Sequence, residues 1–184
     1  MLRSIVRKPI TKKLREFKRM IVFLLRHGMT SRAETDMDRS LTQDGIAALQ
    51  EVVGRRVDDL ANLNKVFTGP LGRIRQTAEI AAEVAGYKGE VSDLQSLNKL
   101  SRGQEITASL QDIDMNAGDL LLVSHESSLC NLMMWLAGED ILMPNSSLSA
   151  IETQAWGRSD GKLLWQESPN SREIKRAINF ADQF

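Results

Sequence analysis

Cysteine is almost absent from this chain: Cys130 is the only one, so no disulfide can form within the chain. A single thiol fits a reducing compartment, and we expect a cytoplasmic protein. The sequence also has only two histidines and no closely spaced pair of cysteines, so the usual clusters of zinc ligands are missing. We therefore expect no resident metal ion and no other cofactor.

Long apolar runs are missing as well. No stretch approaches the roughly 18 residues that a membrane-spanning helix needs, and Lys or Arg interrupts every short apolar stretch near the start. We expect neither a signal peptide nor a membrane partner. The formal net charge is zero, which argues against a nucleic-acid-binding protein. The composition, 42% hydrophobic and 26% charged, is that of a globular protein with one sizeable core.

The zero net charge conceals an asymmetry along the chain. Residues 1–19 carry eight basic side chains and one acidic one, a net charge of +7, so residues 20–184 carry −7. We expect a basic N-terminal extension, residues 1–19, that docks on an acidic surface of its own or a neighbouring subunit. A single domain should follow over residues 20–184. The oligomeric state does not follow from the sequence.

The pattern of apolar residues predicts strands alternating with helices. Short apolar runs indicate strands at 21–25, 65–68, 90–92, 119–123, 149–156 and 162–166. Helical periodicity and end signals indicate helices at 43–61, 73–85, from about 104, at 127–137 and, briefly, after Pro169. Thr42 is the expected cap of the first. This order predicts an α/β fold, with a mostly parallel sheet and helices on both faces.

Both histidines follow a strand that is expected to be buried. His27 comes after the run 21–25, and His125 comes after 119–123 with only Ser124 between. Ligands of open parallel sheets bind at the carboxyl ends of the strands. If the two strands are neighbours, the two imidazoles face one crevice, to which Arg26 and Arg73 can add guanidinium groups.

Two imidazoles and two guanidinium groups suit a phosphoryl group. Arginine binds phosphate oxygens with two parallel hydrogen bonds, and a histidine nitrogen can act as a nucleophile. Each residue also has a structural explanation, because a histidine after a strand is more often an ordinary loop residue. Cys130 lies in an apolar helical stretch, where packing is its expected role.

Three ordered motifs resemble a known family. Leu25-Arg26-His27-Gly28 resembles the RHG signature of the histidine phosphatase superfamily, which includes the phosphoglycerate mutases. The run from Gly69 to Ala78, GPLGRIRQTA, resembles its SPxxRxxQTA segment, and Ser124-His125 resembles the site of its second histidine. The run 40–45, SLTQDG, is similar to the PLTxxG of the family. The resemblance covers roughly residues 20–177.

Within the superfamily the chain looks most like the small SixA-type phosphohistidine phosphatases. The resemblance implies a three-layer α/β/α sandwich without a cap domain, and a metal-independent phosphatase that forms a phosphohistidine intermediate. It makes His27 the nucleophile, places Arg26, Arg73 and His125 around the phosphate, and lets Gly28 approach the ligand closely. Gly69 departs from the usual serine, and Met29 replaces an acidic residue.

The resemblance leaves the substrate open. The sequence favours phosphohistidine in a protein, because no general acid can be placed and Glu105 and Glu126 are only candidates. The first alternative is a small-molecule phosphomonoesterase, which needs such an acid. The second, from another class, is a phospho-binding adaptor without turnover, and the presence of a nucleophile argues against it.

Overall fold

A computed structural model describes residues 19–35, 37–169 and 171 of the chain. Ten elements follow one another along it. The strands are β1 (Met20–Arg26), β2 (Leu63–Thr68), β3 (Val91–Asp93), β4 (Asp119–Ser124), β5 (Leu148–Thr153) and β6 (Gly161–Glu167). The helices are α1 (Gln43–Gly54), α2 (Gly72–Val84), α3 (Gly103–Ala108) and α4 (Glu126–Ala137).

The strands form one sheet in the order β3-β2-β4-β1-β5-β6. β3, β2, β4 and β1 run parallel, whereas β5 is antiparallel to both of its neighbours. β1 and β4 lie side by side in the centre, with Arg26 paired to Ser124. The prediction that the two histidine-bearing strands are neighbours is therefore confirmed, as is the mostly parallel sheet.

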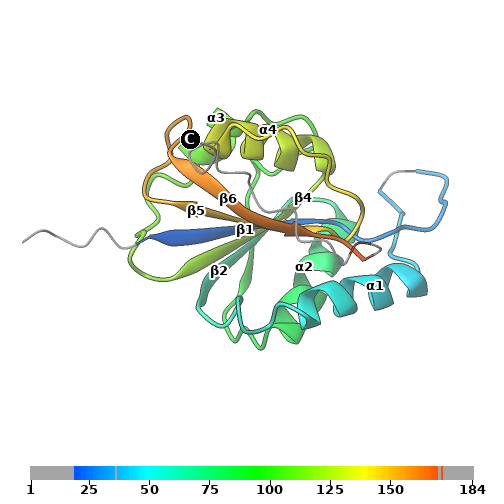
Figure 1. Cartoon of the computed structure of the whole chain (residues 1–184). Helices are drawn as coiled ribbons and strands as arrows, with labels where there is room; N and C mark the ends of the chain where they lie inside the picture. The colour runs from blue at the N-terminus through cyan, green and yellow to red at the C-terminus, as the bar shows by residue number, and fades with distance from the viewer. Residues whose placement is uncertain (1–18, 36, 170, 172–184) are drawn as a thin grey trace, which may run out of the picture.

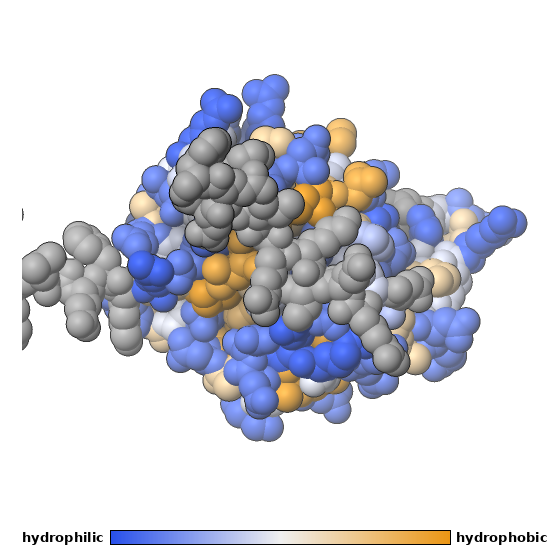
Figure 2. Space-filling view, in the orientation of Figure 1, coloured by the Kyte–Doolittle hydropathy of each residue, from blue (hydrophilic) through white to orange (hydrophobic). Residues whose placement is uncertain are grey.

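Side chains alternate across the sheet and build two apolar layers. On one face Val22, Leu24, Leu120 and Leu122 pack under α3 and α4. On the other face the intervening residues of β1 and β4 pack under α1 and α2. Figure 1 shows the resulting three layers, with α3 and α4 on one side of the sheet and α1 and α2 on the other. Figure 2 shows hydrophilic residues around the edge of one face of the molecule and a group of hydrophobic residues near its centre.

Several predicted helix ends are confirmed. The Thr42 hydroxyl accepts a hydrogen bond from the Gly45 amide (3.0 Å) and caps α1. Gly86, which follows α2, and Gly138, which ends α4, both have positive φ angles, a conformation that suits glycine. The short 90–92 strand is present one residue later, as β3.

Two predicted boundaries were wrong. Helix α1 ends at Gly54 rather than at residue 61, because the chain continues in turns that keep Leu60 buried but leave Val57 39% exposed. In this turn segment the Arg55 and Arg56 guanidinium groups pair with the buried carboxylate of Glu167 on β6. Strand β5 ends at Thr153 rather than at residue 156.

The predicted N-terminal extension and the predicted last helix lie outside the described residues, apart from Arg19. Arg19 forms an exposed ion pair with Glu152 on β5 (2.9 Å). Among the described helices none is long and apolar enough to span a membrane.

Candidate active site

The pairing of β1 with β4 brings the two histidines together. Their ring centroids are 5.3 Å apart and the ring planes are nearly perpendicular, at 85°. Both residues are buried, with exposed fractions of 9% for His27 and 6% for His125. The backbone fixes this arrangement, because the His27 amide donates to the carbonyl of Ser124 (3.2 Å). The expected juxtaposition of the imidazoles at the carboxyl edge of the sheet is thus present.

The two predicted arginines border the same hollow, which has a volume of about 430 Å³. Arg73 is buried in the first turn of α2, directly after the β2–α2 junction. Arg26 ends β1, and its guanidinium donates to the Met143 carbonyl (2.6 Å) and pairs with Glu126 (3.0 Å). We call this hollow, with Arg26, His27, Arg73 and His125 in its wall, the phosphate pocket.

The His27 ring is held in one tautomer. Its Nδ1 lies 2.9 Å from the carbonyl oxygen of Gly28, which can only accept, so Nδ1 carries the proton. The other ring nitrogen, Nε2, therefore keeps its lone pair. The pKa of His27 is lowered to about 4. Burial is the main cause, and the nearby positive charges of Arg73, Arg26 and Arg39 contribute to the same shift. The ring is neutral at pH 7 and can act as a nucleophile.

Sequence reasoning missed two cations of the phosphate pocket, Arg39 and Lys99. Arg39 is brought there by a bridge between Thr30 and Leu41, and its Nε donates to the Ser31 carbonyl (3.3 Å). Lys99 lies in the loop after β3. The carbonyl of Leu97 in the same loop accepts a hydrogen bond from the Ser124 hydroxyl (2.9 Å). Both residues lie in loops without periodicity, so only their charge could have indicated them.

The glycines of the motifs serve close packing. Gly28 is not among the residues that line the phosphate pocket. A Cβ there would lie 3.2 Å from the Gly45 carbonyl oxygen, and the Gly28 amide donates to the Thr77 hydroxyl (3.3 Å). A Cβ on Gly69 would lie 2.4 Å from the Leu97 carbonyl oxygen. The departure from serine at residue 69 is therefore explained by the close approach of the loop after β3.

The two candidate general acids lie in different places. Glu105 is in the first turn of α3, where its carboxylate accepts from the Arg102 amide (2.9 Å) and forms a capping interaction outside the phosphate pocket. Glu126 lines the phosphate pocket at the start of α4 but is engaged with Arg26. Met29, at the position of the expected acid, is 53% exposed at the rim.

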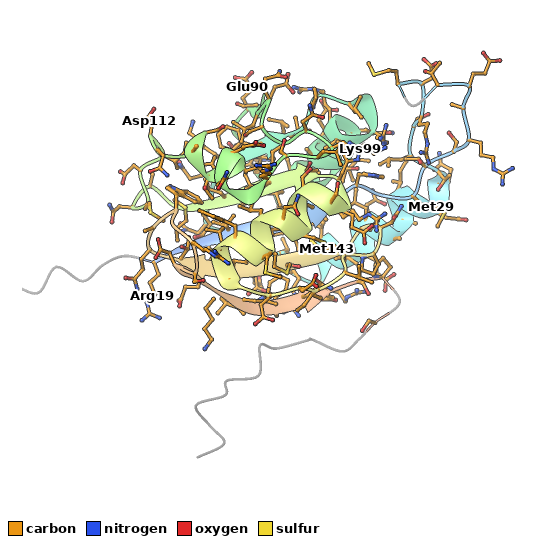
Figure 3. All side chains as sticks on the ribbon, turned by 90° about the horizontal axis from the view of Figure 1, so that it is seen from above. Arg19, Met29, Glu90, Lys99, Asp112 and Met143 are labelled. Atoms are coloured by element: carbon orange, nitrogen blue, oxygen red, sulfur yellow. The ribbon has the colours of Figure 1, made fainter. Side chains whose placement is uncertain are left out.

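The pocket lies at one end of the molecule. In Figure 3 the labelled Met29 and Lys99, which both line it, lie at the same end as the start of α4, opposite Arg19. In the part of the chain that the structure describes, no three His, Cys, Asp or Glu side chains are grouped to hold a metal ion.

Comparison with known proteins connects this geometry to a family. Residues 22–107 match the model of the histidine phosphatase superfamily (branch 1). This segment of the chain belongs to the histidine phosphatase superfamily. The matched segment contains His27 and Arg73. The family is one of phosphatases, so the coarse class of activity is the removal of phosphate from a phosphorylated substrate. No curated protein sequence matches the chain.

Solved structures of this superfamily share the fold. The protein histidine phosphatase SixA, solved with tungstate, superposes with a TM-score of 0.73 at 23% identity, covering 82% of this chain and 97% of that one. A SixA-type protein from Nakamurella multipartitia gives 0.67 at 18% identity, with coverages of 83% and 98%. A phosphoserine phosphatase from Entamoeba histolytica gives 0.60 at 15% identity, with coverages of 81% and 97%. These matches, over 81–83% of this chain, establish the small three-layer fold, and the described residues contain no cap domain.

Proposed function

We propose that the chain is a metal-independent phosphatase in which His27 accepts the phosphoryl group, and that its substrate is phosphohistidine in a protein. The observation that carries the proposal is the state of the His27 ring. Its Nδ1 is tied to the Gly28 carbonyl (2.9 Å), its Nε2 keeps a lone pair, and the pKa near 4 keeps that lone pair unprotonated.

The proposed reaction has two steps. Nε2 of His27 attacks phosphorus and the bond to the leaving group breaks, with its electron pair going to that group; a substrate imidazole that is already protonated on its other nitrogen then departs as neutral imidazole. Water next attacks the phosphohistidine of the enzyme, which releases phosphate, returns the electron pair to Nε2 and gives a proton to the solvent. Arg26, Arg73 and His125 surround the transferring group and neutralise the charge on its oxygens.

The acid–base groups of the phosphate pocket support phosphohistidine as the substrate. An alkoxide leaving group requires a proton, and a positioned acid contributes a factor of about 10²–10⁴. The carboxylate among the described lining residues, Glu126, is paired with Arg26. An imidazole protonated on its second nitrogen leaves without such help. The absence of a cap also leaves room for a side chain displayed on a protein surface.

The nucleophile is tested by changing His27 to Ala. Turnover of a phosphohistidine peptide should be abolished, and rapid quenching of the unchanged enzyme should trap phosphate on His27. Near-normal activity of His27→Ala would refute the mechanism. Chelators should have no effect, because the cations that surround the phosphate pocket disfavour a further cation.

The substrate class is tested by comparing a phosphohistidine peptide with a panel of sugar phosphates. The peptide should be hydrolysed faster, with aryl phosphates between the two. Glu126→Gln keeps an oxygen that can accept from Arg26 and should change phosphohistidine turnover little, and Glu105→Gln serves as the control outside the pocket. If the enzyme hydrolyses a sugar phosphate rapidly and Glu126→Gln cripples that activity, the phosphomonoesterase alternative is correct.

A further inference from the structure

A second hollow, of about 520 Å³, lies beside the phosphate pocket and contains none of the proposed catalytic residues. It lies between the start of α3, the outer face of α4 and the turn before β6. We call it the docking groove, and its wall includes Leu100, Arg102, Asn131, Met134, Trp135 and Arg158. Two of its apolar side chains face solvent, because Leu100 is 80% exposed and Met134 42% exposed. Exposed apolar side chains in a hollow are typical of a binding surface.

The walls of the docking groove are held together before anything binds. A Cβ on Gly103 would lie 2.4 Å from the Trp135 Cβ, so α3 and α4 are in close contact. The Trp135 indole donates to the Trp156 carbonyl (3.2 Å), and the Trp135 carbonyl accepts from the Ser159 amide (2.9 Å). Asn131 donates to the Ser101 carbonyl (3.1 Å). A ligand of such a site does not have to order it first, which favours affinity.

The docking groove adjoins the phosphate pocket along α4. Lys99 lines the pocket and Leu100 the groove, and likewise Ser127 lines the pocket whereas Asn131, one helical turn later, lines the groove. With a rise of about 1.5 Å per residue, Ser127 and Trp135 are about 12 Å apart along the helix axis. A single phosphorylated metabolite or amino acid is too short to fill both sites. A polypeptide spans this distance with about four extended residues.

The charge of the docking groove selects the kind of polypeptide. Arg102 and Arg158 lie in its wall, Lys99 lies at the junction with the phosphate pocket, and no acidic side chain is among the described residues that line it. Neither end segment of the chain itself has complementary charge, since residues 1–18 carry a net +6 and residues 172–184 a net +1. An acidic segment of another protein fits the groove better.

We propose that the docking groove binds an acidic segment, with at least one apolar side chain, of the phosphorylated protein whose phosphoryl group enters the phosphate pocket. The apolar side chain packs between Leu100, Met134 and Trp135, and the carboxylates face Arg102 and Arg158. This inference rests on the proposed function only in taking the substrate to be a protein. It adds a recognition site that is separate from the proposed catalytic residues.

The test uses matched phosphohistidine peptides of about 20 residues. In one, a segment of Asp, Glu and Leu begins about four residues from the phosphohistidine, and in the other Lys replaces each acid. Free phosphohistidine is the third substrate. The unchanged enzyme should prefer the acidic peptide by about tenfold in kcat/KM, mainly through KM. The double change Arg102→Glu with Arg158→Glu should abolish this preference and leave free phosphohistidine turnover within about twofold.

The control is Lys88→Glu with Lys162→Glu, which makes the same change in net charge at exposed sites outside both hollows. It should keep the preference. Equal kcat/KM for the two peptides in the unchanged enzyme overturns the docking groove and leaves the proposed function intact. The same holds if the control variant loses the preference for the acidic peptide as fully as the Arg102 and Arg158 variant does. A preference that emerges only after deletion of residues 172–184 also overturns it, since that segment then occupies the groove.

Binding of the unphosphorylated acidic peptide, followed by fluorescence anisotropy, separates docking from turnover. Binding that is weakened by the Arg102 and Arg158 changes supports the docking groove even if the enzyme hydrolyses only sugar phosphates, an outcome that refutes the proposed function. Binding that the two changes leave unaltered overturns the docking groove.

Discussion

At the scale of single residues, the environment of His27 reconciles two requirements of the phosphate pocket. A phosphate dianion is best bound by cations, whereas a histidine nucleophile must be neutral. The same guanidinium groups that border the pocket add to the effect of burial in lowering the pKa of His27. Under the proposed function, the positive charge that attracts a phosphorylated substrate therefore also keeps the lone pair of Nε2 available.

The pKa of His27 predicts how stability depends on pH. Below pH 6.5 the unfolded chain protonates this histidine, while the folded chain resists protonation until about pH 4, so stability is lost as the pH falls through this window. Relative to His27→Gln, the unchanged protein should lose about 3 kcal/mol of unfolding free energy between pH 7 and 4. Urea titrations at both pH values measure this difference. If the unfolding free energies of the two proteins change in parallel with pH, the pKa of His27 is not lowered by folding.

At the scale of elements, the segment that carries His27 depends on its contact with helix α1. The Met29 amide and carbonyl lie against Gly45 in the first turn of α1, where a Cβ would be 2.4 Å from the Met29 carbonyl oxygen. The Thr42 amide donates to the same carbonyl (2.9 Å). Helix α1 thus positions the chain just after the proposed nucleophile, which explains the glycine of the SLTQDG motif.

Replacing Gly45 by Ala should destabilise the protein by about 2–3 kcal/mol, because the clash is with backbone atoms that cannot rotate away. The same change at Gly54, in the same helix, meets nothing within 4 Å. Gly54→Ala should be neutral or stabilise by up to about 1 kcal/mol. Denaturant midpoints of the two variants provide the comparison, and equal midpoints would contradict the packing argument.

The sequence predicted the elements that have strong local signals. The apolar runs of β1 and β4 are buried on both faces, so they stand out from their surroundings, and the helix ends at Thr42, Gly86 and Gly138 follow from local backbone chemistry. The end of α1 could not be predicted from such local signals. Its apolar pattern continues to Leu60, but the turns there are stabilised by Glu167, more than a hundred residues away.

The residues of the candidate site also divide into those that local sequence signals predicted and those that they did not. His27 and His125 directly follow strands, so the topology alone brings them together. Arg39 reaches the phosphate pocket through the bridge between Thr30 and Leu41, within its own loop. Lys99 lies in the loop after β3, where the Leu97 carbonyl accepts a hydrogen bond from the Ser124 hydroxyl. Loop contacts of this kind leave no periodic pattern in the sequence.

At the scale of the whole molecule, the phosphate pocket and the start of the described chain lie at opposite ends. Strand β1 begins at Met20 and carries the chain to Arg26, a length of about 23 Å at the usual rise per residue. Figure 3 shows Arg19 far from Met29 and Lys99. The described chain therefore begins at the end away from the phosphate pocket.

Deleting residues 1–18 should leave kcat/KM for free phosphohistidine within about twofold, because no strand or helix of the pocket is shortened. The predicted docking of the basic extension on an acidic surface should appear separately, as a lower melting temperature. Activity and thermal unfolding of the truncated protein test the two expectations. A tenfold loss of activity would show that the extension reaches the pocket, and an unchanged melting temperature would exclude a structural role for it.

The position of β1 between β4 and β5 has a consequence for biosynthesis. His27 is made early, but its strand pairs on one side with β4 and on the other with β5, where Leu25 lies opposite Leu148. At about 5–20 residues per second, the 121 residues from His27 to Leu148 take about 6–24 s to synthesise. His27 is therefore synthesised many seconds before the partners of its strand, and during this time the apolar strand β1 has neither neighbour to pair with.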